Sequence, residues 1–102
     1  YVDDITAGVT AAADRCRGYS IYNLGGSATT SLQQLVTAIE RALGKRAILQ
    51  RLPDQPGDVA LTYADVTKAR NELAYQATVS VDEGLRRFCA WYLQERAAGS
   101  IE

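Results

Sequence analysis

The sequence predicts an α/β fold with about four helices and two or three short strands. Three stretches repeat apolar residues at the spacing of one helix face, and a shorter fourth stretch follows Asp65. Between them lie two short runs that favour extended structure: 19–24 is rich in aromatic and β-branched residues, and 46–52 alternates between two faces. At 102 residues the chain is one domain at most. A self-sufficient domain of this size buries about 60–65% of the unfolded chain's surface.

The composition excludes several classes of partner. A net charge of −1 with interspersed signs provides no basic field for nucleic acid or for an anionic membrane. No apolar run approaches the roughly 18 residues that cross a bilayer, and the start lacks the features of a signal peptide. We therefore expect a cytoplasmic protein. Cys16 and Cys89 are expected to be free thiols on helix faces, because cytoplasmic disulfides are rare.

The first helix is expected from about residue 4 to 16. Its predicted apolar face consists of Ile5, Val9, Ala12, Ala13 and Cys16. Asp3 and Asp4 suit the positive end of the helix dipole. A metal or acid–base site is the alternative for this acidic pair, but adjacent residues on a helix do not face each other, so capping is favoured.

A strand, a helix and a second strand are expected next. The first strand covers 19–24 and leads into Gly25-Gly26-Ser27, a turn that lacks the spacing of a phosphate-binding loop. The helix at 31–44 begins with a capping box of Ser31 and Gln34 and ends at Gly44. The second strand covers 46–52. These three elements would make a right-handed βαβ unit if both strands join one sheet.

The central stretch is Gln55-Pro56-Gly57-Asp58-Val59. Proline fixes φ and the following glycine frees it, so a tight turn is expected to present the Asp58 carboxylate at its exit. A carboxylate there can accept two hydrogen bonds from a vicinal diol; the alternative is an ordinary exposed turn. Asp65 is expected to cap a short helix on which Val66, Ala69 and Leu73 share one face.

The last helix is expected to start at Ser80, with Glu83 completing a second capping box. Its predicted inner face consists of Val81, Leu85, Phe88, Cys89 and Tyr92. We interpret these aromatic residues as core, because a stacking platform for nucleic-acid bases needs a cationic groove that the composition does not provide.

Six short motifs occur in an order that spans nearly the whole chain. They are Tyr-Val-Asp-Asp (1–4), Tyr-Asn-Leu-Gly (22–25), Ala-Leu-Gly-Lys (42–45), Pro-Gly-Asp-Val (56–59), Tyr-Ala-Asp-Val-Thr-Lys-Ala (63–69) and Ser-Val-Asp-Glu-Gly-Leu-Arg-Arg-Phe (80–88). That order resembles the C-terminal part of an extended short-chain dehydrogenase/reductase, a Rossmann-type enzyme. Within that superfamily it is most similar to the nucleotide-sugar epimerases, particularly the UDP-glucuronate epimerases.

The resemblance implies a homodimeric parent isomerase that oxidises the sugar at C4 with bound NAD and returns the hydride to the opposite face. It implies that Asp58 binds the uridine ribose diol. Many relatives carry arginine three residues earlier, where this chain has Gln55, as the UDP-glucuronate branch does. Arg51, on the strand before the turn, is then the candidate cation for the diphosphate.

The resemblance also implies how the chain is divided. Residues 1–25 are expected to dock on an absent nucleotide-binding Rossmann lobe, and residues 26–96 to belong to the substrate lobe. The chain opens without Met, directly at a helix start, and we expect it to be part of something longer. If the lobe is absent, Ile5, Val9, Ala13 and the edge of 21–24 lose their cover, so the chain should self-associate or leave residues 1–18 poorly ordered.

The residues that would perform catalysis are missing from the sequence. The family uses a Tyr-x-x-x-Lys pair, and none of the six tyrosines has lysine four residues later. There is no glycine-rich dinucleotide loop and no histidine, hence no serine–histidine triad and no zinc site of the usual kind. We predict no catalytic, cofactor-binding or metal residues, no NAD bound by this chain alone, and no activity.

Two alternatives stay open. A nucleotide-sugar dehydratase, 5-epimerase or decarboxylase of the same superfamily would share this C-terminal pattern. A module without catalytic activity that binds nucleotide-sugars or a protein partner is the alternative from another class.

Overall fold

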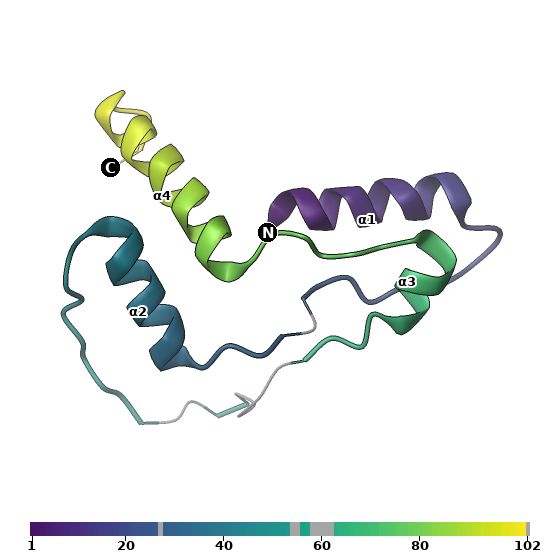
Figure 1. The fold of residues 1–102 in the computed structure, drawn as a ribbon, viewed down its shortest axis with the longest axis horizontal. Helices are drawn as coiled ribbons and strands as arrows, with labels where there is room; N and C mark the ends of the chain where they lie inside the picture. Colours follow the sequence, from purple (N-terminus) through teal and green to yellow (C-terminus); the bar gives the residue numbers. More distant parts are fainter. Residues whose placement is uncertain (27, 54–55, 58–62, 102) are drawn as a thin grey trace. The chain divides into compact units, whose positions relative to one another are not determined.

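The computed structural model describes residues 1–26, 28–53, 56–57 and 63–101. These residues form four helices, as the sequence predicted: α1 (Val2–Arg15), α2 (Leu32–Leu43), α3 (Thr67–Leu73) and α4 (Val81–Ala97) (Figure 1). The chain divides into two compact units. The first unit comprises Tyr1–Thr29 and Asp54–Val79, and the second comprises Thr30–Pro53 and Ser80–Glu102. Helices α1 and α3 therefore belong to the first unit, and α2 and α4 to the second.

The first unit has a small core built on α3. Its buried members are Val66, Ala69, Leu73 and Tyr75. Partly buried residues from three other segments pack against them: Ala11, Ala12, Tyr22, Leu24 and Ala64. Val66, Ala69 and Leu73, which were predicted to share one helix face, are all buried.

Helix α1 packs a face of small residues within the first unit and leaves its more apolar face exposed. Asp4 and Gly8 are buried, whereas Ile5 is 38% exposed and Val9 is 57% exposed. The cause is close packing: a Cβ on Gly8 would lie 2.7 Å from Cδ2 of Leu24. Small residues on this face permit that approach. Ile5, Val9 and Ala13 are exposed in this chain, and their docking on another lobe stays a prediction.

Helix α2 begins and ends as its sequence predicted. The Ser31 hydroxyl accepts a hydrogen bond from the backbone N–H of Gln34, and the Gln34 side chain accepts one from the N–H of Ser31. Gly44 closes the helix with a φ of +64°, in the left-handed region where glycine is favoured. Helix α2 packs against α4 within the second unit.

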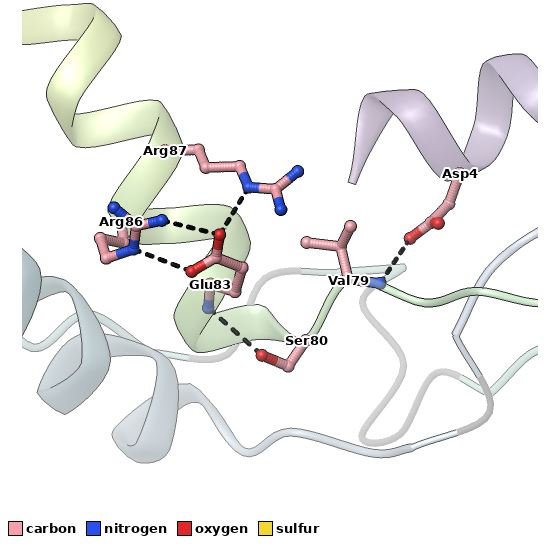
Figure 2. A network of polar contacts seen from close by, with 6 residues as sticks. All are labelled: Asp4, Val79, Ser80, Glu83, Arg86 and Arg87. Atoms are coloured by element: carbon pink, nitrogen blue, oxygen red, sulfur yellow. Dashed lines mark hydrogen bonds and ion pairs between the residues drawn. The ribbon is translucent and has the colours of Figure 1, made fainter.

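Helix α4 forms half of its predicted capping box. The Ser80 hydroxyl accepts a hydrogen bond from the N–H of Glu83, but the Glu83 carboxylate binds the guanidinium groups of Arg86 and Arg87 instead of turning back (Figure 2). Cys89 is buried on this helix as a free thiol. Phe88 is 52% exposed, so its assignment to the core is wrong.

The two segments predicted as strands are not assigned as strands in the described residues. A strand requires a neighbour that completes its ladder of backbone hydrogen bonds, and the described residues provide none for 19–24 or 46–52. These segments belong to different units, so the described residues form no βαβ unit. The prediction of two or three strands is not confirmed. None of the helices in the described residues is both long and apolar enough to cross a membrane.

Candidate functional site

The predicted substrate-binding residues lie around the turn at 56–57. Gln55 and Asp58 fall outside the described residues, so their roles stay predictions. Arg51 is described, exposed and extended, and its guanidinium forms no ion pair with other described residues. Within the described part of the chain it therefore remains a cation that an anionic ligand could approach.

The Pro56-Gly57 turn has the predicted conformation. Gly57 has a φ of +91°, which the third residue of a type II turn requires and which a side chain would oppose. Proline at the preceding position fixes the φ that such a turn needs there. Pro56 and Gly57 therefore form a defined turn, and Asp58 follows it in the sequence.

The helix after the turn begins one residue later than predicted. Val66, not Asp65, is the N-cap of α3. The Asp65 carboxylate still accepts a hydrogen bond from the N–H of Thr67, at 2.9 Å. That backbone hydrogen bond, helped by the Thr67 hydroxyl, lowers the pKa of Asp65. The Asp65 carboxylate therefore satisfies a backbone N–H at the N-terminal end of α3.

Helix α3 is fastened to the segment 21–25 by side chains from both. The Tyr22 hydroxyl donates to Oε2 of Glu72 at 2.7 Å. The Lys68 ammonium donates to the carbonyl of Ile21 at 3.2 Å, and the Asn23 amide donates to the carbonyl of Asp65 at 3.2 Å. The extended segment is thus held by helix side chains where a β-ladder would otherwise hold it.

The fold brings together a tyrosine and a lysine that the sequence spacing did not suggest. The Lys68 ammonium lies 4.7 Å from the centroid of the Tyr22 ring. A tyrosine that acts as a base needs a lowered pKa, but the pKa of Tyr22 is raised, because its hydroxyl donates to the Glu72 carboxylate. The pair is therefore a structural contact, and Tyr22 does not replace the missing catalytic tyrosine.

The C-terminal end of α3 is closed by α1. The Arg15 guanidinium donates to the carbonyl of Leu73 at 2.7 Å, in the last turn of α3. Ala74 follows with a φ of +55°, a conformation that residues with side chains rarely adopt. Both ends of α3 are thus fixed, and the short connection from Tyr63 joins it to the part of the chain that contains Asp58.

Sequence reasoning missed the role of Asp4. Its carboxylate accepts hydrogen bonds from the N–H and hydroxyl of Thr78 and from the N–H of Val79. These hydrogen bonds, the two backbone ones first, lower the pKa of Asp4. Asp4 does lie in the first turn of α1, as expected for the helix dipole. The available signal was its position on the same helix face as Gly8 and Ala12, one turn and two turns later.

The comparisons with known proteins place the chain among sugar-nucleotide enzymes. No protein-family model matches it. It is 40% identical over 96 residues to an uncharacterized protein of Methanocaldococcus jannaschii, a match that covers 94% of this chain and 29% of that protein. It is 39% identical over 92 residues to the UDP-glucuronate 4-epimerase of Thermodesulfobacterium geofontis, covering 89% of this chain and 28% of the enzyme.

Two solved structures are similar along most of the chain. The UDP-glucose 4-epimerase of Bifidobacterium longum, in complex with NAD+ and UDP, gives a TM-score of 0.86 at 31% identity, over 93% of this chain and 29% of that one. A variant of the UDP-glucuronic acid 4-epimerase of Bacillus cereus, in complex with NAD and UDP-4-deoxy-4-fluoro-glucuronic acid, gives 0.83 at 31% identity, over 92% and 31%.

The chain spans less than one third of the length of these proteins. The similarity nevertheless extends over about nine tenths of its own length, in sequence and in structure. The motif order and the comparisons therefore agree that this chain is similar to the C-terminal part of NAD-dependent UDP-sugar 4-epimerases.

Proposed function

We propose that this chain supplies the nucleotide-sugar-binding part of an NAD-dependent 4-epimerase whose substrate is UDP-glucuronate. The observation that carries the proposal is the Pro56-Gly57 turn, with Gly57 at a φ of +91° and Asp58 immediately after it. A carboxylate that follows such a turn in the sequence is suited to accept both hydroxyls of a ribose. The preference for the uronate rests on the similarity to UDP-glucuronate 4-epimerases and on Gln55.

The frame around the turn supports this role. Helix α3 buries Ala69 and Leu73, with 0% and 2% of their surface exposed, and its two ends are held by Asp65 and Arg15. A binding carboxylate is effective when the backbone that carries it is fixed in advance, because the ligand then does not bear the cost of ordering it. The rigid element lies a few residues beyond Asp58.

Arg51 completes the proposal for the substrate. The diphosphate of a UDP-sugar needs a cation, and Gln55 is uncharged. Arg51 lies four residues before Gln55, is exposed, and forms no ion pair with the described residues. We assign it to the diphosphate.

The cofactor does not fit the residues of this chain. Hydride transfer at C4 is the chemistry that NAD supplies in such enzymes. This sequence has no glycine-rich dinucleotide loop and no Tyr-x-x-x-Lys motif. In the described Tyr22–Lys68 pair the pKa of Tyr22 is raised, whereas a tyrosine that acts as a base needs a lowered pKa. We therefore place NAD binding and proton transfer on the part of the enzyme outside these residues. The exposed faces of α1 and of 19–24 are the surfaces that we propose for docking that part.

The test is an assay of the longer enzyme that contains this chain. With NAD present, UDP-glucuronate should be converted to its C4 epimer, and UDP-glucose should react more slowly. Loss of water or of carbon dioxide from the sugar would instead identify the dehydratase or decarboxylase alternative. The 102-residue chain alone should neither bind NAD nor form the epimer. Epimer formed by the purified chain, with host enzyme excluded, would contradict the proposal that NAD binding and proton transfer lie outside these residues.

A further inference from the structure

Residues 46–52 of the second unit expose both apolar side chains and backbone groups without partners. Ile48 is 102% exposed, Leu49 58% and Leu52 69%. Among the described residues, the N–H of Ala47 is the only backbone group of 46–52 that takes part in a hydrogen bond. Apolar side chains in water and unpaired backbone groups are the two features of a strand that lacks its neighbour.

The sequence indicates that both faces of such a strand need cover. Side chains alternate between the two faces of a strand, which places Ile48 and Leu52 on one face and Leu49 on the other. A strand that meets water on one face keeps its apolar residues on the opposite face, whereas a strand covered on both faces carries them on both. Residues 46–52 follow the second pattern, which is typical of a strand inside a layered domain.

The Glu40 side chain distinguishes the two edges of this segment. When a segment pairs as a strand, the backbone groups of successive residues point to opposite edges. Residues 47, 49 and 51 then share one edge, here called the Ala47 edge, and residues 48, 50 and 52 share the Ile48 edge. Glu40, in the last turn of α2, accepts the N–H of Ala47 through Oε1 at 2.8 Å. This contact lies within the second unit, and it occupies a donor of the Ala47 edge.

The residue that follows the segment supports the same distinction. Pro53 continues the Ala47 edge, and proline has no backbone N–H. In sheets, proline is confined to positions where the missing N–H faces no neighbouring strand. The Ala47 edge therefore has one donor bound by a carboxylate and one position without a donor. The Ile48 edge has neither restriction.

We propose that the Ile48 edge is the docking site for a β-strand from the part of the enzyme outside these 102 residues. The occupant is a strand because an extended backbone offers the alternating donors and acceptors that match this edge. A longer chain is available to supply it, because this chain covers 29% and 31% of the two similar epimerase structures. The inference rests on the proposed function only in requiring that longer enzyme.

Amide hydrogen exchange in the longer enzyme, without substrate, tests the edge directly. Exchange at Ile48 and Gln50 should be on the order of 100-fold slower than at Leu49 and Arg51, because hydrogen bonds inside a sheet open only with a larger cooperative unit. In the isolated 102-residue chain all four amides should exchange rapidly. Rapid exchange at Ile48 and Gln50 in the longer enzyme would refute the docking. Equally slow exchange at all four would refute the assignment to one edge.

A pair of variants of the longer enzyme tests the role of Glu40. Glu40→Ala removes the acceptor of the Ala47 N–H, whereas Glu40→Gln keeps an amide oxygen there. Alanine and glutamine are both good helix formers, so α2 should form in each variant. Exchange at Ala47 should become faster in Glu40→Ala and stay near the parent rate in Glu40→Gln, while Ile48 and Gln50 stay slow in both. Slow exchange at Ala47 in Glu40→Ala would show that a strand occupies the Ala47 edge, and would overturn the assignment.

Two further outcomes separate this proposal from its alternatives. If a higher concentration of the isolated chain slows exchange at Ile48 and Gln50, a second copy occupies the edge and the proposed occupant is wrong. A longer enzyme that shows the exchange pattern but forms no C4 epimer would overturn only the proposed function. An enzyme that forms the epimer while those two amides exchange rapidly would overturn only the docking proposal.

Discussion

Leu24 packs so closely over Gly8 that both of its methyl carbons would lie within 2.8 Å of a Cβ at that glycine. The ring of Tyr75 would lie 3.0 Å from the same atom. This contact brings the extended segment 21–25 against α1, and it explains why the helix turns its small residues inwards.

Replacing Gly8 with alanine should destabilise the first unit. Overpacking costs about 1–3 kcal/mol. Alanine gains about 0.8–1 kcal/mol over glycine in a helix, so the expected net loss is on the order of 1 kcal/mol. Urea unfolding measures it. Gly26→Ala is the control, because nothing lies within 4 Å of its Cβ.

A double variant tests the cause of that loss. In Gly8→Ala with Leu24→Ala, the atoms that would collide are gone, so the two changes should not add. A coupling energy of about 0.5–3 kcal/mol is expected for residues in contact. Additive losses would mean that Leu24 is not what excludes a side chain at Gly8.

The core of the first unit should depend strongly on Leu73. Leu73 is 2% exposed, and truncating such a leucine to alanine typically costs about 2–5 kcal/mol. Val9→Ala is the matched control on α1, since Val9 is 57% exposed and surface changes usually stay within about 0.5 kcal/mol. Similar unfolding free energies for the two variants would contradict the core described above.

The stability of the first unit should depend on pH through Asp4. Hydrogen bonds from Thr78 and Val79 hold the pKa of Asp4 below its usual value of 3.8. A carboxyl group whose pKa is lower in the folded state than in the unfolded state stabilises the fold at pH values above the unfolded-state pKa. This stabilisation is lost as the pH falls through the folded-state pKa. The slope of stability against pH below about 4 should therefore be smaller in Asp4→Asn than in the parent chain. Asp3→Asn should keep the parent slope.

In the longer enzyme, Asp58→Ala should weaken the binding of UDP. Two charge-assisted hydrogen bonds at a partly hydrated site are together worth about 2–4 kcal/mol. Calorimetry with UDP gives the dissociation constant directly. Asp14→Asn, an exposed carboxylate on α1, is the control and should leave it unchanged. An unchanged constant for Asp58→Ala would reduce Asp58 to a turn residue.

The isolated chain should self-associate through its first unit. Val2, Val9, Tyr19 and Ile21 are between 57% and 88% exposed. At about 25 cal/mol per Å2, burying roughly 400 Å2 of such surface is worth on the order of 10 kcal/mol, enough to offset the entropy of association. Sedimentation at micromolar concentration should show a dimer or larger species.

Two substitutions locate that interface. Ile21→Lys should shift the chain towards monomer, because it places a charge on the proposed face. Ile48→Lys changes a fully exposed residue of the second unit, and it should have no effect. A parent chain that sediments as a monomer, with strongly protected amides at 21–24, would show that the first unit is stable without a partner on its exposed apolar surface.

Local signals predicted the helices well. Ser31 with Gln34, Gly44 and Ser80 are caps whose chemistry is complete within four residues of sequence, so periodicity and capping located α2 and α4. The Pro56-Gly57 turn belongs to the same class, since its geometry follows from the two residues alone.

Periodicity and capping signals could not predict the long-range contacts. The buried face of α1 is set by Leu24 approaching Gly8, and the use of Asp4 is set by Thr78, which lies 74 residues away. Periodicity placed Ile5 and Val9 on one apolar face, but it could not show that the face of small residues is the one that packs within this unit. The candidate site followed from the family motif around Asp58, and no local pattern of charge or hydrophobicity would have separated Asp58 from an ordinary turn residue.

The hydrogen bond from Arg15 to the carbonyl of Leu73 has a consequence for the order of folding. Helix α3 has 7 residues, and isolated helices shorter than about 12 residues are marginal in water. It cannot persist before Arg15 arrives from 58 positions upstream, by which time the intervening chain has been closed into a large loop. We therefore expect closure of this loop to slow assembly of the first unit, and α1 to be ordered no later than α3 during refolding.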